Sequence, residues 1–373
     1  MVQGMAEHLC EAFDLTVFFP QGSSHLDLPK AASSREIGFP PGKRISGMRK
    51  AAAPLVLPAR LRAFEKLCER AGADISGSAQ LALVHNSMYV AAPPLLKYLR
   101  IPSVYFCYEY PRHLYEPAIV RRTRSRLQYI LLSRLRGLEK KMDMESCLAA
   151  DRVVCLSSWM KRRIGDIYGI EADIVRPGIP EDFCQGFQSG NRVNRVLSVG
   201  ALWPFKGHEM AMETVAALPG DVRPSLAVVA DREFPGYADR LMEAAEELSV
   251  KLSIHRHIPD TSLKELYSGS RAVLCCQRNE PYGMVPLEAM SCGTPVIAVK
   301  EGGFTDNITD GENGFLVPRD SQKMAAALER VLKEPSLALR ISTGGMEFVE
   351  KERSLRSAAD RLTDILKDTL KRG

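Results

Sequence analysis

Short apolar runs rich in β-branched residues alternate with longer helical patterns along the whole chain. Short runs of this kind are typical of buried strands, and the longer patterns between them predict helices. Such alternation is the signature of α/β domains in which helices connect parallel strands. The sequence therefore predicts an α/β fold built from doubly wound parallel sheets.

The expected strands share an apolar, β-branched composition: Leu15–Phe19, Leu81–His85, Ser103–Cys107, Arg152–Leu156, Val196–Val199, Ser225–Val229, Ala272–Cys276 and Thr294–Val299. The expected helices have apolar residues at helical spacing: Ala6–Phe13, Ala59–Ala71, Leu127–Asp143, Glu209–Ala217, Tyr237–Leu248 and Ser321–Val331. After Val331 the chain is expected to turn helical again, through Leu355, Leu362 and Leu366.

The length of 373 residues predicts two domains, because a single core stops growing at roughly 250 to 300 residues. Residues 178–195 are rich in Gly, Pro, Asn and Gln and predict the seam between them. We expect a first domain over residues 1–185 and a second over 186–345. Residues 346–373 are expected to form a C-terminal helix that packs back towards the first domain.

The start of the chain departs from the usual order, in which a doubly wound domain begins with a strand and a glycine loop close to a ligand. Here the sequence opens on Gly4 and a helical pattern. Two interpretations stay open: the first strand is absent from this sequence, or the sheet begins with Leu15–Phe19.

The nine cysteines are scattered and show no Cys-x-x-Cys spacing. This argues against a disulfide framework or a zinc site and favours a reducing compartment. No apolar run approaches the ~20 residues that span a bilayer, and the N-terminus has no signal-peptide pattern. We therefore expect a cytoplasmic protein.

The net charge of +5 is unevenly spread, with a basic run between Arg112 and Lys141 that includes Arg121 and Arg122. Such a run attracts phosphates, nucleic acid or anionic lipid, although a solvated helix face explains it equally well. Because the run has few interleaved aromatic residues, nucleic acid is the least favoured partner.

The stretch NEPYGMVPLEAMSCGTPVIA, residues 279–298, places two glutamates around a Pro-Tyr-Gly turn. The turn follows the expected strand that ends at Cys276, and a helix is expected to begin near Met284. Ligands of open α/β sheets bind at the carboxyl ends of strands, and a helix N-terminus presents unpaired N–H groups to phosphate. We therefore expect the backbone from Gly283 to Val285 to bind phosphate.

Glu280 precedes this helix start and Glu288 lies about one turn beyond it. As acceptors, the two carboxylates suit the vicinal hydroxyls of a ribose and of a sugar. An ordinary loop charge and a first-turn charge are the simpler interpretation. The acid–base pair of a glycoside hydrolase is a further alternative. The phosphate-binding context instead favours two carboxylates that contact opposite ends of one ligand.

Two further segments carry glycines beside polar residues. In VLSVGALWPFKGHEM a strand leads to Gly200 and then to Lys206, which could neutralise a departing diphosphate, although a surface lysine is the simpler interpretation. In GGFTDNITDGENGFLVP the glycines at 302 and 303 permit a tight turn, which alone is a weak signal.

Together these segments resemble the retaining glycosyltransferases of family 4, which have the GT-B fold of two Rossmann-like domains facing across a cleft. The family's pair of glutamates separated by seven residues is matched by Glu280 and Glu288. Its glycine followed by Lys-Gly is matched by Gly200, Lys206 and Gly207.

The resemblance implies a nucleoside diphosphate sugar held by the second domain, an acceptor held by the first, and transfer with retention, without metal or other cofactor. Glu288 would bind the ribose, Glu280 the donor sugar and Lys206 the diphosphate. The implied donor-binding set is Gly4, Gly200, Lys206, Ile258, Glu280, Tyr282, Gly283, Met284, Val285 and Glu288. The implied catalytic set is Lys206, Glu280 and Tyr108, with Arg112, Arg121 and Arg122 on the acceptor or membrane side.

The chain departs from the family pattern at several positions. Ala201 stands where the family has an arginine, Tyr108 where it has a histidine, and Asp306 where it has a glutamate. Loss of one cation at a diphosphate site costs a few kcal/mol of transition-state stabilisation. Arg278, or an arginine between 112 and 126, is a candidate to replace it.

We therefore expect a hexosyltransferase, using mannose or glucose, that acts on a polysaccharide or lipid-linked glycan at the inner face of the membrane. The alternative is a weak or inactive GT-B protein that binds a sugar nucleotide or glycan. A phosphorylase or epimerase of the same fold is less favoured, because no pyridoxal phosphate lysine context is present.

Overall fold

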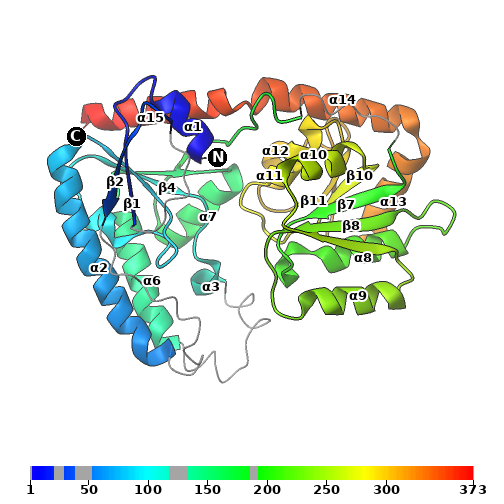
Figure 1. Cartoon of the computed structure of the whole chain (residues 1–373), viewed down its shortest axis with the longest axis horizontal. Helices are drawn as coiled ribbons and strands as arrows, with labels where there is room; N and C mark the ends of the chain where they lie inside the picture. The colour runs from blue at the N-terminus through cyan, green and yellow to red at the C-terminus, as the bar shows by residue number, and fades with distance from the viewer. Residues whose placement is uncertain (1, 21–28, 38–52, 117–132, 185–191, 373) are drawn as a thin grey trace. The chain divides into compact units, whose positions relative to one another are not determined.

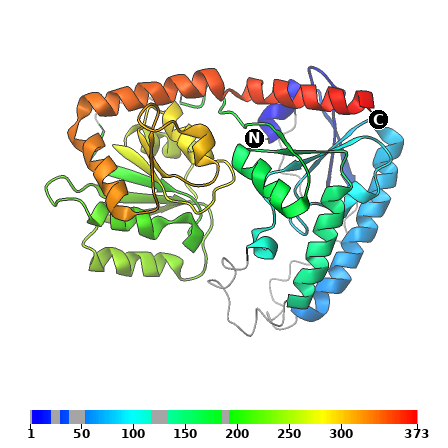
Figure 2. The same cartoon turned by 180° about the vertical axis from the view of Figure 1, so that it is seen from behind.

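The computed structural model describes residues 2–20, 29–37, 53–116, 133–184 and 192–372. It contains two compact units, each with a parallel sheet flanked by helices (Figures 1 and 2). The first unit comprises Met1–Arg176 and Ala358–Gly373, and the second comprises Pro177–Ser357. The expected boundary between residues 185 and 186 lies outside the described residues, and the second unit continues beyond 345. The predicted α/β fold with parallel sheets is confirmed.

The first unit is built on a parallel sheet in the order β3-β4-β5-β6. Its strands are β3 (Ala82–His85), β4 (Ser103–Cys107), β5 (Arg152–Cys155) and β6 (Asp173–Ile174). Every residue of β4 is buried, which fits its mainly apolar sequence. The helices are α1 (Val2–Leu9), α2 (Ala53–Ser78), α3 (Arg112–Tyr115), α6 (Ser133–Leu148) and α7 (Ser158–Tyr168), and α2 and α6 lie side by side (Figure 1).

The N-terminal segment differs from its expected form. Residues 6–13 were expected to be helical, but α1 covers Val2–Leu9, because Met5, Ala6 and Leu9 are the residues that its inner face buries. The expected strand at 15–19 is β1 (Thr16–Pro20), and it pairs with β2 (Ser33–Ile37) in a separate two-stranded sheet. Among the described strands, the main sheet of the first unit therefore begins with β3.

The second unit contains a six-stranded parallel sheet in the order β12-β11-β10-β7-β8-β9. Its strands are β7 (Arg195–Val199), β8 (Ser225–Ala230), β9 (Leu252–Arg256), β10 (Ala272–Cys275), β11 (Val296–Val299) and β12 (Phe315–Val317). Numbered from β7 and read from β9, the order is 3-2-1-4-5-6, that of dinucleotide-binding folds. The strand order reverses between β7 and β10, and such a switch point is where these sheets bind ligands.

Helices connect these strands and end the chain: α8 (His208–Ala216), α9 (Tyr237–Glu247), α10 (Asp260–Ser268), α11 (Met284–Ser291), α12 (Phe304–Asn307), α13 (Ser321–Lys333), α14 (Pro335–Glu352) and α15 (Leu355–Arg372). The helical pattern after Val331 thus becomes two long helices with a break at Arg353 and Ser354. The Arg353 guanidinium donates hydrogen bonds to Asn307 Oδ1 at 3.1 Å and to the Asp306 carbonyl at 2.9 Å, which fixes the break.

One disulfide joins Cys184 to Cys292, whose Cα atoms are 5.2 Å apart. The spacing of the cysteines argued against a disulfide framework and did not predict this pair, because residues far apart in sequence meet in the fold. In the described part of the chain, no helix has the length and apolarity needed to cross a membrane.

Candidate functional site

Lys206 and Glu280 lie on the loops that follow β7 and β10, the strands that flank the switch point. The Lys206 ammonium Nζ lies 2.9 Å from Glu280 Oε2. About a quarter of each side chain is exposed, 24% and 22% respectively. Solvent therefore weakens this ion pair, and an anionic ligand can compete for the lysine.

Two contacts hold the loop after β7 against the loop after β10. The Arg278 amide donates to the Phe205 carbonyl at 2.9 Å, which places Arg278 directly beside the Lys206 backbone. The Gln277 side chain donates to the Val199 carbonyl at 3.0 Å. Arg278, a candidate replacement for the missing cation, therefore belongs to the same pair of loops as Lys206.

His208 packs against the backbone of the loop that contains Gly200. The sequence did not predict it as a site residue. Its side chain is buried and bonds to the Ser198 hydroxyl at 2.9 Å and to the Gly200 and Ala201 carbonyls at 3.2 Å. Burial lowers the pKa of His208 to about 4, although the two carbonyls oppose this shift. A neutral imidazole is therefore built into the loop that carries Lys206.

The double glycine packs against the backbone of Glu280. The Gly303 amide donates to the Glu280 carbonyl at 2.7 Å. A Cβ at Gly302 would lie 2.7 Å from the Glu280 amide nitrogen, and Gly302 has a φ of +60°. Only glycine allows this approach without strain, so this segment fixes the position of Glu280.

Arg319 fixes the loop after β10 from the other side, and the sequence did not single it out. Its guanidinium pairs with Glu301 Oε2 at 2.7 Å and donates to the carbonyls of Cys276 at 2.8 Å and Gln277 at 2.9 Å. Burial alone would raise the pKa of Glu301, but Arg319 lowers it overall. Arg319 thereby holds the loop after β10 through one ion pair and two hydrogen bonds to its backbone.

The helix α11 begins directly after Gly283, whose φ is +93°. Met284 and Val285 occupy its first turn and are partly exposed, and the first N–H groups of a helix have no partner within the helix. A Cβ at Gly283 would lie 2.7 Å from the ring of Phe304, which explains the glycine. The helix start therefore has the backbone form of a phosphate-binding N-terminus.

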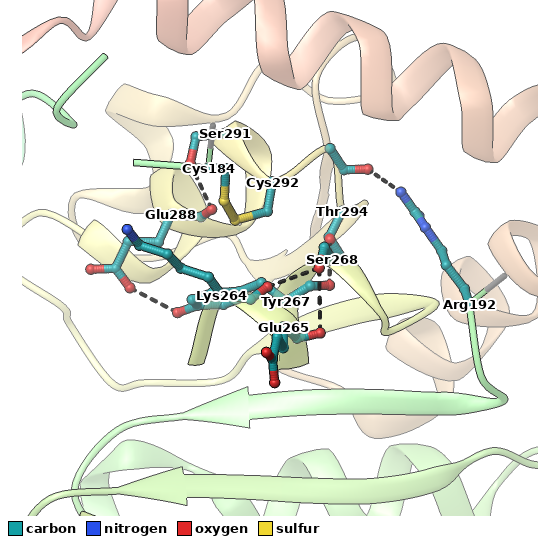
Figure 3. The surroundings of a disulfide bond; sticks show 11 residues. Cys184, Arg192, Lys264, Glu265, Tyr267, Ser268, Glu288, Ser291, Cys292 and Thr294 are labelled. Atoms are coloured by element: carbon teal, nitrogen blue, oxygen red, sulfur yellow. Dashed lines mark hydrogen bonds between the residues drawn. A yellow bond between two sulfur atoms is a disulfide. The ribbon is translucent and has the colours of Figure 1, made fainter. Parts of the chain in front are cut away.

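Glu288 lies one turn into α11 and accepts a hydrogen bond from Tyr267 of α10, at 2.8 Å from the hydroxyl to Oε2 (Figure 3). Burial raises the pKa of Glu288, the Tyr267 hydrogen bond opposes this rise, and Asp260 adds to it. The other end of α11 carries Cys292 and the disulfide. Its other carboxylate oxygen has no hydrogen-bond partner among the described residues, so the carboxylate can accept from a ligand.

Two other predicted donor-binding residues are placed differently. Tyr282 is buried, and its hydroxyl donates to the Pro177 carbonyl at 2.6 Å, so its side chain anchors the loop. Ile258 lies on the loop after β9, two strands from β7, and is partly exposed. The structure brings Lys206, Glu280 and Gly200 together. Glu288 lies on the neighbouring helix α11, and Ile258 lies on the loop after β9.

The remaining predicted residues belong to the first unit. Tyr108 directly follows β4 and is hydrogen bonded to His85. Arg112 pairs with Glu109 at 3.8 Å and Glu116 at 3.2 Å and is only 11% exposed. Gly4 lies within α1, and Arg121 and Arg122 lie outside the described residues. Among the described side chains, no cluster of three or more potential metal ligands is present.

Solved structures with the same fold are glycosyltransferases of the GT-B class. The sucrose-phosphate synthase of Thermosynechococcus elongatus superimposes with a TM-score of 0.74 at 18% identity, covering 100% of this chain and 93% of that chain. Anabaena HepE, in complex with UDP and glucose, has a TM-score of 0.70 at 16% identity, covering 98% of this chain and 95% of that chain. WaaG, a glycosyltransferase involved in lipopolysaccharide biosynthesis, has a TM-score of 0.65 at 19% identity, covering 98% of this chain and 94% of that chain.

The sequence itself assigns the family. The profile described as "Glycosyl transferases group 1" matches residues 184–370, and "Glycosyltransferase Family 4" matches residues 1–183. The chain belongs to these family 4 glycosyltransferases.

Curated relatives include D-inositol 3-phosphate glycosyltransferases. That of Acidothermus cellulolyticus is 30% identical over 221 residues, 53% of this chain and 49% of that protein. That of Mycolicibacterium smegmatis is 30% identical over 199 residues, 52% of this chain and 45% of that protein. The chain therefore matches about half the length of these relatives.

Proposed function

We propose that the chain transfers a hexose, mannose or glucose, from a nucleoside diphosphate sugar to an acceptor, with retention of configuration and without a metal ion. One observation carries the proposal: Lys206, Glu280 and the start of α11 converge on the loops at the switch point of a Rossmann-like sheet. These groups offer one cation, one acceptor of sugar hydroxyls and a set of phosphate-binding amides.

Each group has a role in this proposal. The acceptor hydroxyl attacks the anomeric carbon, the bond from that carbon to the diphosphate breaks, and the hydroxyl proton leaves with the diphosphate. Lys206 and the amides from Gly283 to Val285 stabilise the charge that grows on the diphosphate. Glu288 accepts hydrogen bonds from the ribose, and Glu280 accepts them from the transferred sugar.

The Lys206–Glu280 ion pair gives this site a resting form. When the diphosphate binds, the ammonium exchanges its contact with Glu280 for the phosphate, and Glu280 becomes available to sugar hydroxyls. A single ligand with both a diphosphate and a sugar therefore satisfies both partners, whereas a nucleoside monophosphate satisfies one. This exchange favours diphosphate sugars as a class.

The proposed donor and acceptor follow from the chemistry and from relatives. HepE is described in complex with UDP-glucose, so UDP-sugars are the first donors to test. The proposed acceptor is a polysaccharide or lipid-linked glycan at the cytoplasmic face of the membrane, with the first unit as its binding domain. Arg112, Arg121 and Arg122 are the proposed contacts on the acceptor or membrane side. Since curated relatives are named for inositol 3-phosphate, that compound is a second acceptor to test.

A second candidate function is a weak or inactive protein that binds a sugar nucleotide or glycan. Ala201, in place of an arginine, favours it, because the diphosphate site then relies on Lys206 and on Arg278 of the neighbouring loop. The two candidates share donor binding and differ in turnover.

A thermal-shift panel of nucleoside diphosphate sugars tests the shared step. We expect one donor to stabilise the wild type, by about 2.7 kcal/mol at a hundredfold excess over Kd, and the shift to vanish in Glu288→Ala. The matched control is Glu265→Ala, an exposed glutamate of α10 that should keep the shift. Equal stabilisation of wild type and Glu288→Ala would exclude Glu288 from donor binding.

A further inference from the structure

Arginines gather at the amino edge of the sheet in the second unit, the edge opposite the loops of the candidate site. Arg192 precedes β7, Arg195 is its first residue, and Arg271 directly precedes β10. The Arg271 amide donates to the Arg195 carbonyl at 2.8 Å, and the residues that follow, Val196 and Ala272, are paired in the register. Two adjacent strands therefore begin with arginines at one edge.

Arg192 and Arg271 each make one guanidinium hydrogen bond with the described residues. Arg192 donates to the carbonyl of Gly293, directly after α11 (Figure 3), and Arg271 donates to the Leu332 carbonyl of α13 at 2.7 Å. Cations are favourable at the C-terminal ends of helices, so capping explains part of this arrangement. A guanidinium group has five N–H donors, however, and most of these stay unused.

The unused donors of the two arginines are open to solvent. Both side chains are partly exposed. Their nitrogens are not among the buried polar atoms without a partner in the described part of the chain. A solute can therefore reach these N–H groups.

Arg223, at the same edge before β8, uses its guanidinium group differently. It donates four hydrogen bonds to carbonyls: two to Leu218 at 3.2 and 3.0 Å, one to Ala216 at 2.7 Å and one to Ser249 at 3.5 Å. These bonds hold the chain that follows α8. Support of the local backbone thus accounts for Arg223, but it accounts for only a small part of the donors of Arg192 and Arg271.

The positive charge at this edge has no counter-charge among the described residues, because none of the three arginines at the starts of β7 and β10 forms an ion pair there. Residues 183–194 contain no Asp or Glu. Glu329 and Glu334, at the end of α13, pair with bases of their own helix. Burial and the charge of Arg271 lower the pKa of Arg192, which shows that the two cations repel each other.

We propose that Arg192 and Arg271 bind a phosphate group at this edge, with Arg195 adding to the positive field. The planar fork of a guanidinium group matches phosphate oxygens, and the charge of phosphate offsets the repulsion between the two arginines. Two guanidinium groups from separate strands suit a tetrahedral oxyanion better than a carboxylate, which has only two oxygens. Free phosphate and the phosphate of an organic monoester share this chemistry. The site lies at the edge opposite Lys206 and does not depend on the proposed function.

Calorimetric titration with inorganic phosphate, at an ionic strength held constant with chloride, tests the site. We expect the wild type to bind phosphate and the Kd to rise about tenfold or more in Arg192→Met and in Arg271→Met, the scale of one hydrogen bond to a charged group. Lys206→Met, which removes the cation of the candidate donor site, should bind phosphate as the wild type does. Glycerol 3-phosphate as a second probe distinguishes the sources: tighter binding than inorganic phosphate indicates an organic monoester, and equal or weaker binding indicates free phosphate.

Arg223→Met is the matched control, because it removes an arginine of the same edge whose donors are taken up by carbonyls. It should keep phosphate binding. It should also lower the midpoint of urea unfolding more than Arg271→Met, which releases a single carbonyl and removes one repulsion. Arg192→Lys keeps the charge and loses the fork, so it tests the site even where Arg192→Met does not fold, and we expect an intermediate phosphate affinity.

Equal phosphate affinity of the wild type, Arg192→Met and Arg271→Met would overturn the site, as would a wild type that does not bind phosphate. Loss of binding in Lys206→Met alone would place the phosphate at the candidate donor site and also overturn the inference. An equal loss in Arg223→Met would show that these arginines act only through stability. Failure of the wild type to bind UDP would instead contradict the proposed function, and the phosphate titrations would still test the arginines.

Discussion

At the scale of single residues, the hydrogen bond from the Tyr267 hydroxyl affects the ionisation of the Glu288 carboxylate, and with it the ability of Glu288 to accept hydrogen bonds from a ligand. In the proposed function Glu288 accepts hydrogen bonds from the ribose, which requires the ionised carboxylate, yet burial favours its protonated form. The Tyr267 hydroxyl, at 2.8 Å, stabilises the ionised form. Around the carboxylate, Asp260 of α10 acts against ionisation, and Cys275 of β10 has its own pKa raised partly by Glu288.

We predict that Tyr267→Phe makes donor affinity more sensitive to acid. Without the hydroxyl the pKa of Glu288 rises further, so the ionised acceptor is depleted first as the pH falls. We expect a loss of roughly three- to tenfold near pH 7 that grows towards pH 5.5. The measurement is the Kd of the donor between these pH values.

Tyr237→Phe is the control for this prediction, because Tyr237 is a buried tyrosine of α9 beside Glu209. Its removal should change stability without a pH-dependent change in donor affinity. A loss in Tyr267→Phe that is the same at every pH would show that the hydroxyl acts on packing rather than on the charge of Glu288.

Sequence patterns could identify candidate site residues that lie in a recognisable local motif. They could not identify the residues from distant parts of the chain that contact and position these motifs. Glu280, Glu288 and Lys206 stood out because each follows a strand or a glycine turn in a recognisable spacing. His208 and Arg319 did not, since their roles depend on carbonyls brought to them by folding. No spacing rule connects such pairs before the strand order is known.

At the scale of elements, two neighbouring residues before α13 have separable tasks. Arg319 reaches out to hold the loop after β10, through Glu301 and two carbonyls. Asp320 caps α13, accepting from the amides of Gln322 at 2.9 Å and Lys323 at 3.1 Å. One residue therefore supports the candidate site, and the next supports only its helix.

We predict that Arg319→Met lowers both stability and donor affinity. It removes the ion-pair partner of Glu301 and releases two carbonyls, so the free energy of unfolding should fall by about 1–3 kcal/mol, less than for a fully buried pair because both groups are partly exposed. The donor Kd should rise, because the loop that carries Glu280 loses its anchor. Denaturant unfolding and calorimetric titration measure the two effects.

The neighbouring cap supplies the control. Asp320→Ala should cost about 1 kcal/mol of stability, as removal of an N-cap does, and should leave donor affinity unchanged. For each variant, the loss of donor affinity is divided by the loss of stability. If this ratio were the same for Arg319→Met and Asp320→Ala, the affinity loss would follow from lower stability, and Arg319 would have no specific effect on the loop after β10.

Most strands were predicted where a run of apolar residues is buried on both faces, as in β4, β10 and β11. The strands without an expectation are short or lie at edges: β2, β6, β9 and β12. In β9 polar residues alternate with apolar ones, because an edge strand is covered on fewer sides. For these strands the pairing partner, rather than the local sequence, decides the structure.

At the scale of the whole molecule, the length predicted two units, and two are present. The order of the strands, and with it the meeting of the loops after β7 and β10, could not be derived from the sequence alone. The first unit also includes residues 358–373, and Asp368 of α15 forms an ion pair with Arg152 at 2.6 Å.

The disulfide lies wholly within the second unit and closes a span of 108 residues. We predict that reduction lowers the stability of that unit by about 2–4 kcal/mol, because the unfolded chain gains freedom. Scanning calorimetry with and without dithiothreitol measures the shift in its transition. Cys184→Ser should melt like the reduced wild type and no longer respond to the reductant, whereas a response in this variant would locate the effect elsewhere.

Release of the nucleoside diphosphate from the donor tests the proposed catalysis of sugar transfer by the switch-point loops of the second unit. The assay follows UDP-glucose and the other donors of the panel, with and without inositol 3-phosphate, and NMR records the anomer of the released or transferred sugar. We expect turnover with retention, reduced about 10²–10³-fold in Lys206→Met and unchanged in Lys323→Met, an exposed lysine of α13. Inversion of configuration, equal turnover by Lys206→Met and wild type, or donor binding with no release from any donor would contradict retaining transfer by these loops.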